Sequence, residues 1–357
     1  MIKVLIVDDS QVARRVLREW LSPEKDIRVV GEAEDGSEVL ELVKELEPDL
    51  IIMDILMPKM SGLEATEIIM AYQPTPILVF SSVANNKEAN IAFEAISRGA
   101  LDVIAKPDGA GKNERAIREE MLKKVRILSR IPVIPHTRGK IRKKKPALEI
   151  KTQEPARIEA LEEKYELLAI GASTGGPKAI CDILSQFPKD FPAPIVIVQH
   201  IADSFMEGMA NWLKRESELL VKIAEAGEKL KPGTVYLAPP GLHLLVRNQR
   251  VALSNISPVN SCKPSVDVLF HSLAESYGRK VVAVLLTGMG EDGAAGMKEI
   301  HDKGGRTIAQ DEKSSIVFGM PASAIELGAV DQVASLEKIP EVIFQAFALK
   351  KTGGKDK

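Results

Sequence analysis

The sequence predicts an α/β protein made of two doubly wound, parallel-sheet domains joined by a charged linker. Two stretches of the chain alternate short β-branched runs with amphipathic segments, a pattern typical of a parallel sheet with helices on both faces. Between them, prolines and the cationic run TRGKIRKKKP replace the periodic pattern. We therefore expect domains at residues 1–125 and 163–350, a linker at 126–162 and a polar tail at 351–357.

Strands of the first domain are predicted where apolar, β-branched residues gather in short runs. Helical patterns such as SQVARRVLREWL and GSEVLELVKEL separate these runs, so we expect the strands to be parallel. The candidate strands, in chain order, are KVLIV (3–7), IRVVGEA (27–33), DLIIMD (49–54), PILVFSS (76–82) and DVIAK (102–106).

The second domain repeats this alternation, with one exception. The segment 234–254, TVYLAPPGLHLLVRNQRVALS, is rich in turn residues and indicates an antiparallel hairpin. The candidate strands are YELLAI (165–170), APIVIVQ (193–199), VKIAEA (221–226), TVYLAP (234–239), HLLVRN (243–248), RVALS (250–254), VVAVLLTG (281–288) and RTIAQ (306–310).

Composition restricts the functional classes. With 45% hydrophobic residues, 27% charged residues and a formal net charge of -2, the chain as a whole is not expected to bind nucleic acid or a membrane surface. The six cations from Arg138 to Lys145 are interpreted as a solvated joint rather than a site for nucleic acid or acidic lipid. Cys181 and Cys262 are too few for a disulfide framework, so we expect them to have a packing role. Without a signal pattern or an apolar run of about 20 residues, we expect a cytoplasmic protein that does not insert into membranes.

Polar side chains follow the predicted strands of the first domain. Asp8 and Asp9 follow the first strand, Asp54 the third, Ser81 the fourth and Lys106 the fifth. Because the carboxyl ends of parallel strands meet at one edge of a sheet, we expect these side chains to lie together. Three clustered carboxylates favour a hard cation such as Mg²⁺, and the lysine and hydroxyl suit a phosphoryl group. One acidic residue alone would favour a helix cap instead.

This combination of strand ends resembles the receiver domain of two-component response regulators over residues 1–125. The resemblance implies that Asp54 accepts a phosphoryl group, that Mg²⁺ binds the three carboxylates, and that Ser81 and Lys106 are the switch hydroxyl and lysine. Receivers commonly carry an aromatic residue three positions before the lysine, where this chain has Val103. We therefore do not expect a switch based on an aromatic rotamer.

In the second domain, Ser173, His200 and Asp292 each follow a predicted parallel strand and are expected to converge at one edge. An imidazole can take the proton of a serine hydroxyl, and a carboxylate keeps that imidazole in the right tautomer. The loop GASTGG also suits a phosphate cradle or a plain turn, but it lacks both nucleotide-binding glycine patterns. The order Ser, His, Asp differs from that of α/β-hydrolases, so Gly-x-Ser-x-Gly is only a weak match to that fold.

The segments IGASTGGP, VQHIADSF and LLTGMGEDGAAGM resemble the protein-glutamate methylesterases of bacterial chemotaxis, and this resemblance spans nearly the whole chain. It implies that Ser173 is the nucleophile, His200 the general base and acid, and Asp292 the orienting carboxylate. Thr174 would help to hold the histidine, and the backbone N–H of Met289 would bind the oxyanion. A neutral histidine is needed, so we expect turnover to fall below an ordinary imidazole pKa of about 6 to 7.

The resemblance also implies the partners. The substrate would be a methylated glutamate, or a glutamine to be deamidated, on the cytoplasmic helices of a chemoreceptor. A chemotaxis histidine kinase would donate the phosphoryl group, and the unphosphorylated receiver would cover the active-site face. Mg²⁺ would bind only in the receiver, with no cofactor in the catalytic domain and no nucleic-acid partner. A receiver-linked hydrolase with another ester or amide substrate, and a non-catalytic adaptor, remain alternatives.

The remaining polar residues favour structural roles. Ser265 and Asp267 are interpreted as a helix cap and a first-turn acid, although they belong to a segment similar to one that lines the family's active site. The other histidines show no zinc-ligand spacing with one another and are expected at the surface or in packing: His136, His243, His271 and His301.

Overall fold

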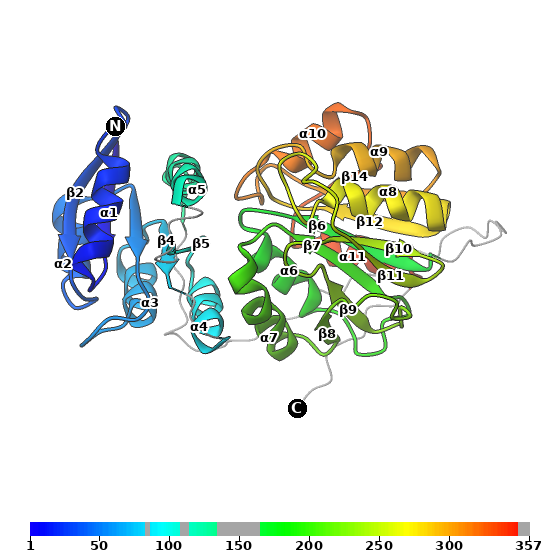
Figure 1. Cartoon of the computed structure of the whole chain (residues 1–357), viewed down its shortest axis with the longest axis horizontal. Coiled ribbons are helices and arrows are strands. Elements are labelled where there is room, and N and C mark those ends of the chain that lie inside the picture. The colour runs from blue at the N-terminus through cyan, green and yellow to red at the C-terminus, as the bar shows by residue number, and fades with distance from the viewer. Residues whose placement is uncertain (83–85, 108–113, 134–164, 349–357) are drawn as a thin grey trace, which may run out of the picture.

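The computed structural model describes residues 1–82, 86–107, 114–133 and 165–348. Figure 1 shows two α/β bodies side by side, the first running from blue to cyan and the second from green to red. Most of the expected linker and the whole expected tail lie outside the described residues. Within the described part of the chain, no helix has both the length and the hydrophobicity that crossing a bilayer requires.

The first body contains a five-stranded parallel sheet in the order β2-β1-β3-β4-β5, which confirms the predicted strands and their parallel direction. Its last helix, α5, ends at Leu128, slightly beyond the expected boundary at residue 125. The elements are β1 (Ile2–Val7), α1 (Gln11–Leu21), β2 (Ile27–Ala33), α2 (Val39–Leu46), β3 (Leu50–Met53), α3 (Gly62–Tyr72), β4 (Ile77–Ser81), α4 (Asn86–Ser97), β5 (Asp102–Ala105) and α5 (Glu114–Leu128).

Alternating side chains of the strands build a core on each face of this sheet. Val4 and Ile6 of β1 belong to a cluster that also contains residues of α1 and α5, whereas Leu5 and Val7 belong to a cluster with residues of α2, α3 and α4. Successive strand residues point to opposite faces, so a strand buried on both faces must be apolar throughout. This is why the strands read as continuous apolar runs rather than as alternating ones.

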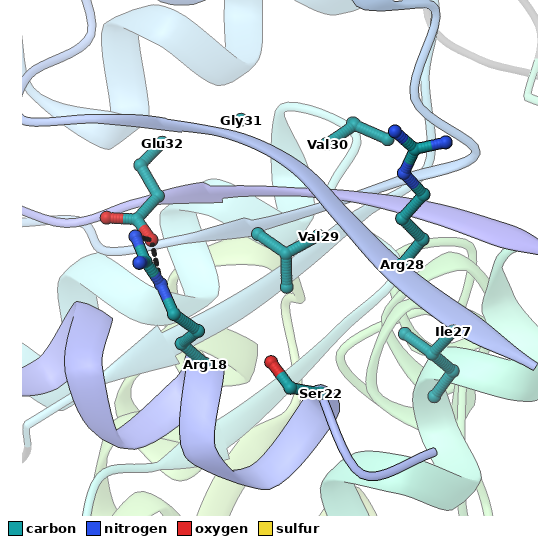
Figure 2. A pocket seen from close by; sticks show the side chains of 8 residues that line it. All are labelled: Arg18, Ser22, Ile27, Arg28, Val29, Val30, Gly31 and Glu32. Carbon is teal, nitrogen blue, oxygen red and sulfur yellow. Dashed lines mark hydrogen bonds and ion pairs between the residues drawn. The ribbon is translucent and has the colours of Figure 1, made fainter. Parts of the chain in front are cut away.

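The edge strand β2 borders a shallow groove beside α1 (Figure 2). Arg18 of α1 and Glu32 of β2 form an ion pair there. Because β2 and β5 lie at opposite edges of the sheet, this groove is remote from β5.

The second body contains a seven-stranded sheet, β14-β13-β12-β6-β7-β9-β8, in which every pairing is parallel. The predicted hairpin is confirmed as the separate antiparallel pair β10-β11. Its strands are β6 (Leu167–Ala172), β7 (Ile195–Gln199), β8 (Leu220–Ile223), β9 (Thr234–Leu237), β10 (His243–Arg247), β11 (Arg250–Ser254), β12 (Val281–Leu285), β13 (Arg306–Gln310) and β14 (Gln332–Ala334). Its helices are α6 (Gly176–Leu184), α7 (Met206–Glu216), α8 (Val266–Tyr277), α9 (Ala294–Asp302), α10 (Met320–Glu326) and α11 (Ile339–Ala346), with 3-10 turns η1 (Asp203–Phe205) and η2 (Gly278–Lys280).

The strand order of the second body determines where its candidate functional site lies. From β6 the chain continues to β7 on one side, while β12 pairs with β6 on the other side, so the order reverses around β6. In open parallel sheets, such a switch point leaves a crevice beyond the carboxyl ends of the strands. The segments that follow β6, β7 and β12 therefore converge at one edge.

Candidate active site

The loop after β6 presents Ser173 at the switch point. The N–H of Ser173 donates to the carbonyl of Thr287, 3.0 Å away, and the carbonyl of Ser173 accepts from the N–H of Gly176 at 2.8 Å. Gly175 is the N-cap of α6 and has a φ of 77°, a left-handed conformation that favours glycine. The loop is thus a tight turn that leaves the serine side chain partly exposed.

His200 and Asp292 form a hydrogen-bonded pair beside this loop. The backbone N–H of His200 donates to the carbonyl of Ala172 at 3.0 Å, which keeps the end of β7 next to the end of β6. The imidazole Nε2 lies 2.8 Å from Oδ2 of Asp292. A residue just after β7 and one in the loop after β12 therefore meet, as the sequence predicted from strand ends.

Asp292 is buried at the N-terminus of α8. Its carboxylate accepts hydrogen bonds from the hydroxyl of Ser265 at 2.7 Å, the N–H of Val266 at 2.7 Å and the N–H of Asp267 at 3.1 Å. Burial alone would raise the pKa of Asp292, but its bonds to His200, Ser265 and Val266 outweigh burial and lower the pKa below its usual range. The side chain therefore stays ionised and can orient an imidazole.

Ser265 is a helix cap, as predicted, but it also has a second role. Its hydroxyl accepts from the N–H of Val268 as the N-cap of α8, but it donates to Asp292 as well. Asp267 is a first-turn acid of α8, as expected, and accepts from Asn260 Nδ2 at 2.7 Å. The two cap residues thus help to hold the carboxylate of Asp292 in place.

Cys262 lies beside the histidine, which sequence reasoning missed. Its Sγ is 3.8 Å from Nδ1 of His200, and the side chain is partly exposed. Cys181 is buried, which agrees with the expected packing role, whereas Cys262 is partly exposed. Burial lowers the pKa of His200, but the contacts with Asp292 and Cys262 outweigh burial and raise the pKa to about 9. This value lies above the ordinary range expected from the sequence.

Gln199, also missed, connects the serine and histidine loops. Its Nε2 donates to the carbonyl of Ser173 at 2.8 Å and to the carbonyl of His200 at 2.9 Å, and the residue is only 2% exposed. Within the described residues, no hydrogen bond joins Oγ of Ser173 to His200. Catalytic hydrogen bonds are often completed only when substrate binds. The side chain of Gln199, which holds the backbones of both loops, therefore keeps Ser173 and His200 close to each other.

Two backbone N–H groups near Ser173 are candidates for binding an oxyanion. Gly288 packs against the serine so closely that a Cβ at position 288 would lie 2.8 Å from the Ser173 Cβ. The next N–H, that of Met289, and the N–H of Thr174 make no hydrogen bond among the described residues. The hydroxyl of Thr174 also makes no hydrogen bond with His200 in that part of the chain, unlike the expected contact, and the Thr174 carbonyl accepts from Thr287 Oγ1 at 2.9 Å.

The other described histidines contact residues other than Ser173 and Asp292. The buried His243 accepts the N–H of Ser265 at Nδ1, a packing role as expected. His271 pairs with Glu299 and His301 lies near Asp331, each on a partly solvated surface. His136 lies outside the described residues.

The strand-end residues of the first body do gather at one edge. The Nζ of Lys106 lies 2.7 Å from a carboxylate oxygen of Asp8 and 2.8 Å from one of Asp54. Oxygens of Asp8, Asp9 and Asp54 all lie within 4.8 Å of one another. Burial raises the pKa of Asp8 above its usual range, although Lys106 acts to lower it. Ser81 lies at the end of β4, and its hydroxyl donates to the carbonyl of Ser82 at 3.3 Å.

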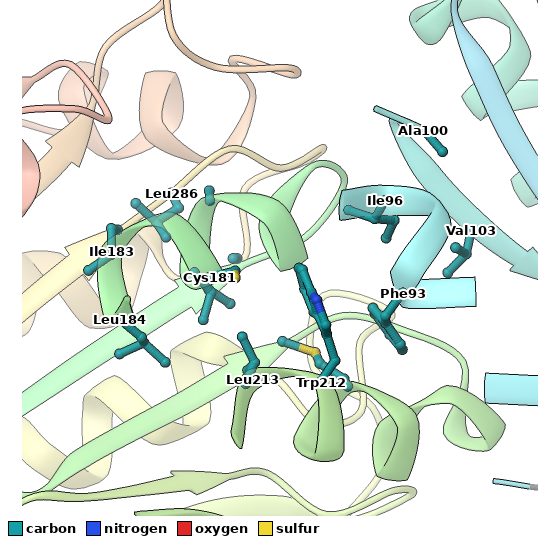
Figure 3. Close-up of a cluster of buried hydrophobic side chains, with 14 of the residues drawn as sticks. Phe93, Ile96, Ala100, Val103, Cys181, Ile183, Leu184, Trp212, Leu213 and Leu286 are labelled. Carbon is teal, nitrogen blue, oxygen red and sulfur yellow. The ribbon is translucent and has the colours of Figure 1, made fainter. Parts of the chain in front are cut away.

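An aromatic interface joins the two bodies. Phe93 of α4 stacks on Trp212 of α7 with ring centroids 5.5 Å apart (Figure 3). Phe93 also meets Phe205 edge-on, with ring centroids 6.2 Å apart. Helices α4 and α7 approach closely at Gly208, where an added Cβ would lie 2.6 Å from the Ala89 Cβ. The three aromatic residues and Ala89 belong to one buried cluster that continues from the first core into the second. The contact surface between the two bodies is therefore packed like a hydrophobic core.

The interface extends to the back of the serine loop. A cavity of about 140 Å³ is lined by Ala100 and Leu101 of the first body and by Gly175, Lys178 and Thr287 of the second. Gly175 follows Ser173 by two positions, and Thr287 accepts the Ser173 N–H. The α4–β5 segment of the first body therefore borders the same cavity as residues that flank Ser173.

The fold and site together define a response regulator with an enzymatic output domain. Residues 168–343 match the family described as CheB methylesterase, and residues 4–118 match the response regulator receiver domain. The chain belongs to the CheB methylesterase family.

Two full-length relatives and one solved structure illustrate this membership. The chain is 44% identical over 345 residues, 96% of each chain, to a protein-glutamate methylesterase/protein-glutamine glutaminase of Anaeromyxobacter dehalogenans. It is 38% identical to the protein of that name from Pyrococcus horikoshii, over 99% of this chain and 95% of the relative. The crystal structure of the CheB methylesterase catalytic domain of Thermotoga maritima is 43% identical with a TM-score of 0.50, and the match covers 51% of this chain and 98% of that one.

Proposed function

We propose that this protein is a phosphorylation-regulated serine hydrolase that demethylates glutamate methyl esters, and deamidates glutamines, on chemoreceptor helices during chemotactic adaptation. The observation that carries the proposal is the His200–Asp292 hydrogen bond of 2.8 Å beside the tight turn of Ser173. Membership of the CheB methylesterase family supplies the substrate class. A chemotaxis histidine kinase is the phosphodonor, and the protein acts from the cytoplasm.

In the proposed reaction, Oγ of Ser173 attacks the carbonyl carbon of the ester, and His200 takes the hydroxyl proton. Because Nε2 is engaged with Asp292, Nδ1 is the nitrogen that accepts this proton once substrate brings the serine into contact. The N–H groups of Thr174 and Met289 bind the oxyanion. The histidine then gives its proton to the departing methoxy oxygen, and methanol leaves the acyl-enzyme.

Water completes the cycle. His200 takes a proton from water as the oxygen attacks the acyl carbon, and then returns the proton to Oγ of Ser173, which frees the glutamate. A glutamine side chain passes through the same acyl-enzyme, with ammonia as the leaving group. The charged imidazole that forms in both halves is stabilised by Asp292, whose low pKa keeps it anionic.

In the receiver, Asp54 is the proposed phosphoryl acceptor. The oxygen-only donor set of Asp8, Asp9 and Asp54 fits Mg²⁺, which prefers carboxylate ligands, and the ion would neutralise charge on the phosphoryl oxygens. Lys106 contacts Asp54 and would pair with the phosphoryl group, while Ser81 would donate its hydroxyl to it.

Regulation follows from the interface. In the arrangement described, the receiver packs against α7 and the back of the serine loop, and we assign this to the inhibited form. Phosphorylation of Asp54 would pull on Lys106 and Ser81 at the ends of β5 and β4. Those strands flank α4, the helix that carries Phe93, so the docking surface would change and the closed form would lose population.

The test compares initial rates of methanol release from methyl-labelled receptor membranes. Full-length protein should be slow until phosphodonor and Mg²⁺ are added, and Asp54→Asn should stay slow under the same conditions. A fragment of residues 163–350 should be fast and indifferent to phosphodonor. Equal rates for the fragment and the unphosphorylated full-length protein would refute inhibition by the receiver.

A further inference from the structure

Cys262 is held rigidly beside the catalytic histidine by a tight turn. Val259 and Cys262 exchange backbone hydrogen bonds of 3.1 and 2.8 Å, and the two residues between them, Asn260 and Ser261, have φ values of 51° and 62°. Positive φ at both central positions is the conformation of a type I′ turn. Asn260 Nδ2 also donates to Asp267, which ties the turn to the start of α8. The thiol is therefore preorganised, although it is partly exposed.

The histidine is oriented in the way that a metal-ligating histidine is. When Nε2–H of His200 donates to Asp292, the lone pair of the neutral ring is on Nδ1, the nitrogen that faces Cys262. Metal-bound histidines characteristically donate their other N–H to a carboxylate, which fixes ring and tautomer. Here that carboxylate is itself held by Ser265 and by backbone N–H groups of α8.

The separation of the two donor atoms fits one ion. Typical zinc bonds of about 2.0 Å to nitrogen and about 2.3 Å to sulfur, at a tetrahedral angle, place the donors about 3.5 Å apart. Nδ1 of His200 and Sγ of Cys262 are 3.8 Å apart, so very little movement is needed. The donor set also discriminates: a thiolate and an imidazole select zinc or cadmium, whereas the carboxylates of the receiver suit magnesium.

We propose that Cys262 and His200 form an inhibitory binding site for thiophilic divalent ions, with Zn²⁺ and Cd²⁺ as the metals it takes. Binding forms a metal–sulfur bond and a metal–nitrogen bond, the thiol proton goes to solvent, and water fills the remaining positions. The ion occupies Nδ1, the nitrogen that must accept the Ser173 proton, so hydrolysis stops. The inhibition rests on the proposed function, but metal binding does not.

Direct binding is measured first, because it needs no activity. Full-length protein is titrated with Cd²⁺ in the presence of excess Mg²⁺, and the ultraviolet thiolate-to-cadmium absorption is recorded. Wild-type protein and Ser173→Ala should both show saturable absorption, Cys262→Ser should show none above background, and His200→Ala should bind at least about tenfold more weakly. Cys181→Ser is the matched control and should behave as wild type. A wild-type titration without this absorption, or an unchanged one in Cys262→Ser, overturns the proposal.

Inhibition is measured second, as the rate with Zn²⁺ relative to each variant's own metal-free rate. Zn²⁺ should inhibit wild type and Cys181→Ser, EDTA should reverse the inhibition, and Cys262→Ser should need at least about tenfold more Zn²⁺. The receiver carboxylates are intact in all of these variants, so they cannot account for a difference. Equal inhibition of wild type and Cys262→Ser overturns the inhibitory role. Cadmium binding in a protein that releases no methanol would instead show that only the proposed function has failed.

Discussion

Substitution of Gly208 by alanine should release the catalytic domain from its receiver. Gly208 lies in α7, and a Cβ at this position would be 2.6, 2.7 and 2.9 Å from Cβ, C and O of Ala89 in α4. Two of these atoms are backbone, so no side-chain rotation relieves the overlap. Since ordinary carbon contacts begin at about 3.5 Å, the helices must separate by almost 1 Å.

The size of the effect follows from that overlap. Overpacking of this kind costs about 1–3 kcal/mol, and the cost falls only on the closed form because Ala89 belongs to the other domain. The equilibrium should therefore shift toward the open form by about 5- to 150-fold. In the open form, alanine is preferred to glycine within a helix by up to about 1 kcal/mol, so the catalytic domain itself should not be destabilised.

The assay is methanol release by full-length protein without phosphodonor. Gly208→Ala should raise this basal rate by the stated factor, up to the rate of the isolated fragment 163–350. Glu207→Ala, an exposed change at the preceding position of α7, is the control and should leave the rate unchanged. The same glycine substitution in the fragment should change nothing. A full-length Gly208→Ala protein that keeps the wild-type basal rate, with wild-type thermal stability, would refute this reasoning about the interface.

Further outcomes are expected at three residues, in metal-free catalytic assays or in unfolding experiments. The pKa of His200 is raised to about 9, so turnover should already fall as the pH drops through the range above 7. Asp292→Asn should move the midpoint of this pH profile to lower pH. A wild-type midpoint at pH 6.5 or below contradicts this expectation. Because the pKa of His200 is higher in the folded protein than in the unfolded chain, the charged imidazole stabilises the fold fully below about pH 6.5. This stabilisation is lost as the pH rises through about 9. Gln199→Ala should lower kcat by up to about 100-fold with little change in KM, because the loops of Ser173 and His200 lose their clamp; a raised KM at unchanged kcat would speak against it. Ser265→Ala should lower the free energy of unfolding by about 1–2 kcal/mol, because α8 loses its N-cap and Asp292 loses a hydrogen bond. An unchanged denaturant midpoint would count against this role of Ser265.

Strand ends were predictable because two simple signals coincide there. A short apolar run marks a buried parallel strand, and the first polar residue after it must lie at the functional edge of the sheet. That reasoning brought His200 and Asp292 together, and likewise Asp8, Asp54 and Lys106. Strand β14 escaped prediction because its three residues, QVA, are too short to show a period.

The supporting residues could not be predicted in the same way. Gln199 is the last residue of a buried strand, and this polar position was the one local signal for it. Cys262 and His200 are 62 positions apart in the sequence, and the packing of α8 brings the turn of Cys262 next to the histidine. The pKa of His200 depends on those same long-range contacts. The fit of Gly208 against Ala89 is a property of two surfaces, which no periodic pattern within one segment encodes.

The central claim is that Ser173 is the nucleophile of an ester hydrolase, and methanol release tests it most directly. Wild-type protein, given phosphodonor and Mg²⁺, is compared with Ser173→Ala on methyl-labelled receptor membranes, with thermal unfolding to show that both are folded. We predict steady methanol release by wild type and a rate lower by about 10⁴-fold or more for Ser173→Ala, because one missing member disables the triad. Near-normal release by Ser173→Ala, or no release by either protein, would contradict the account.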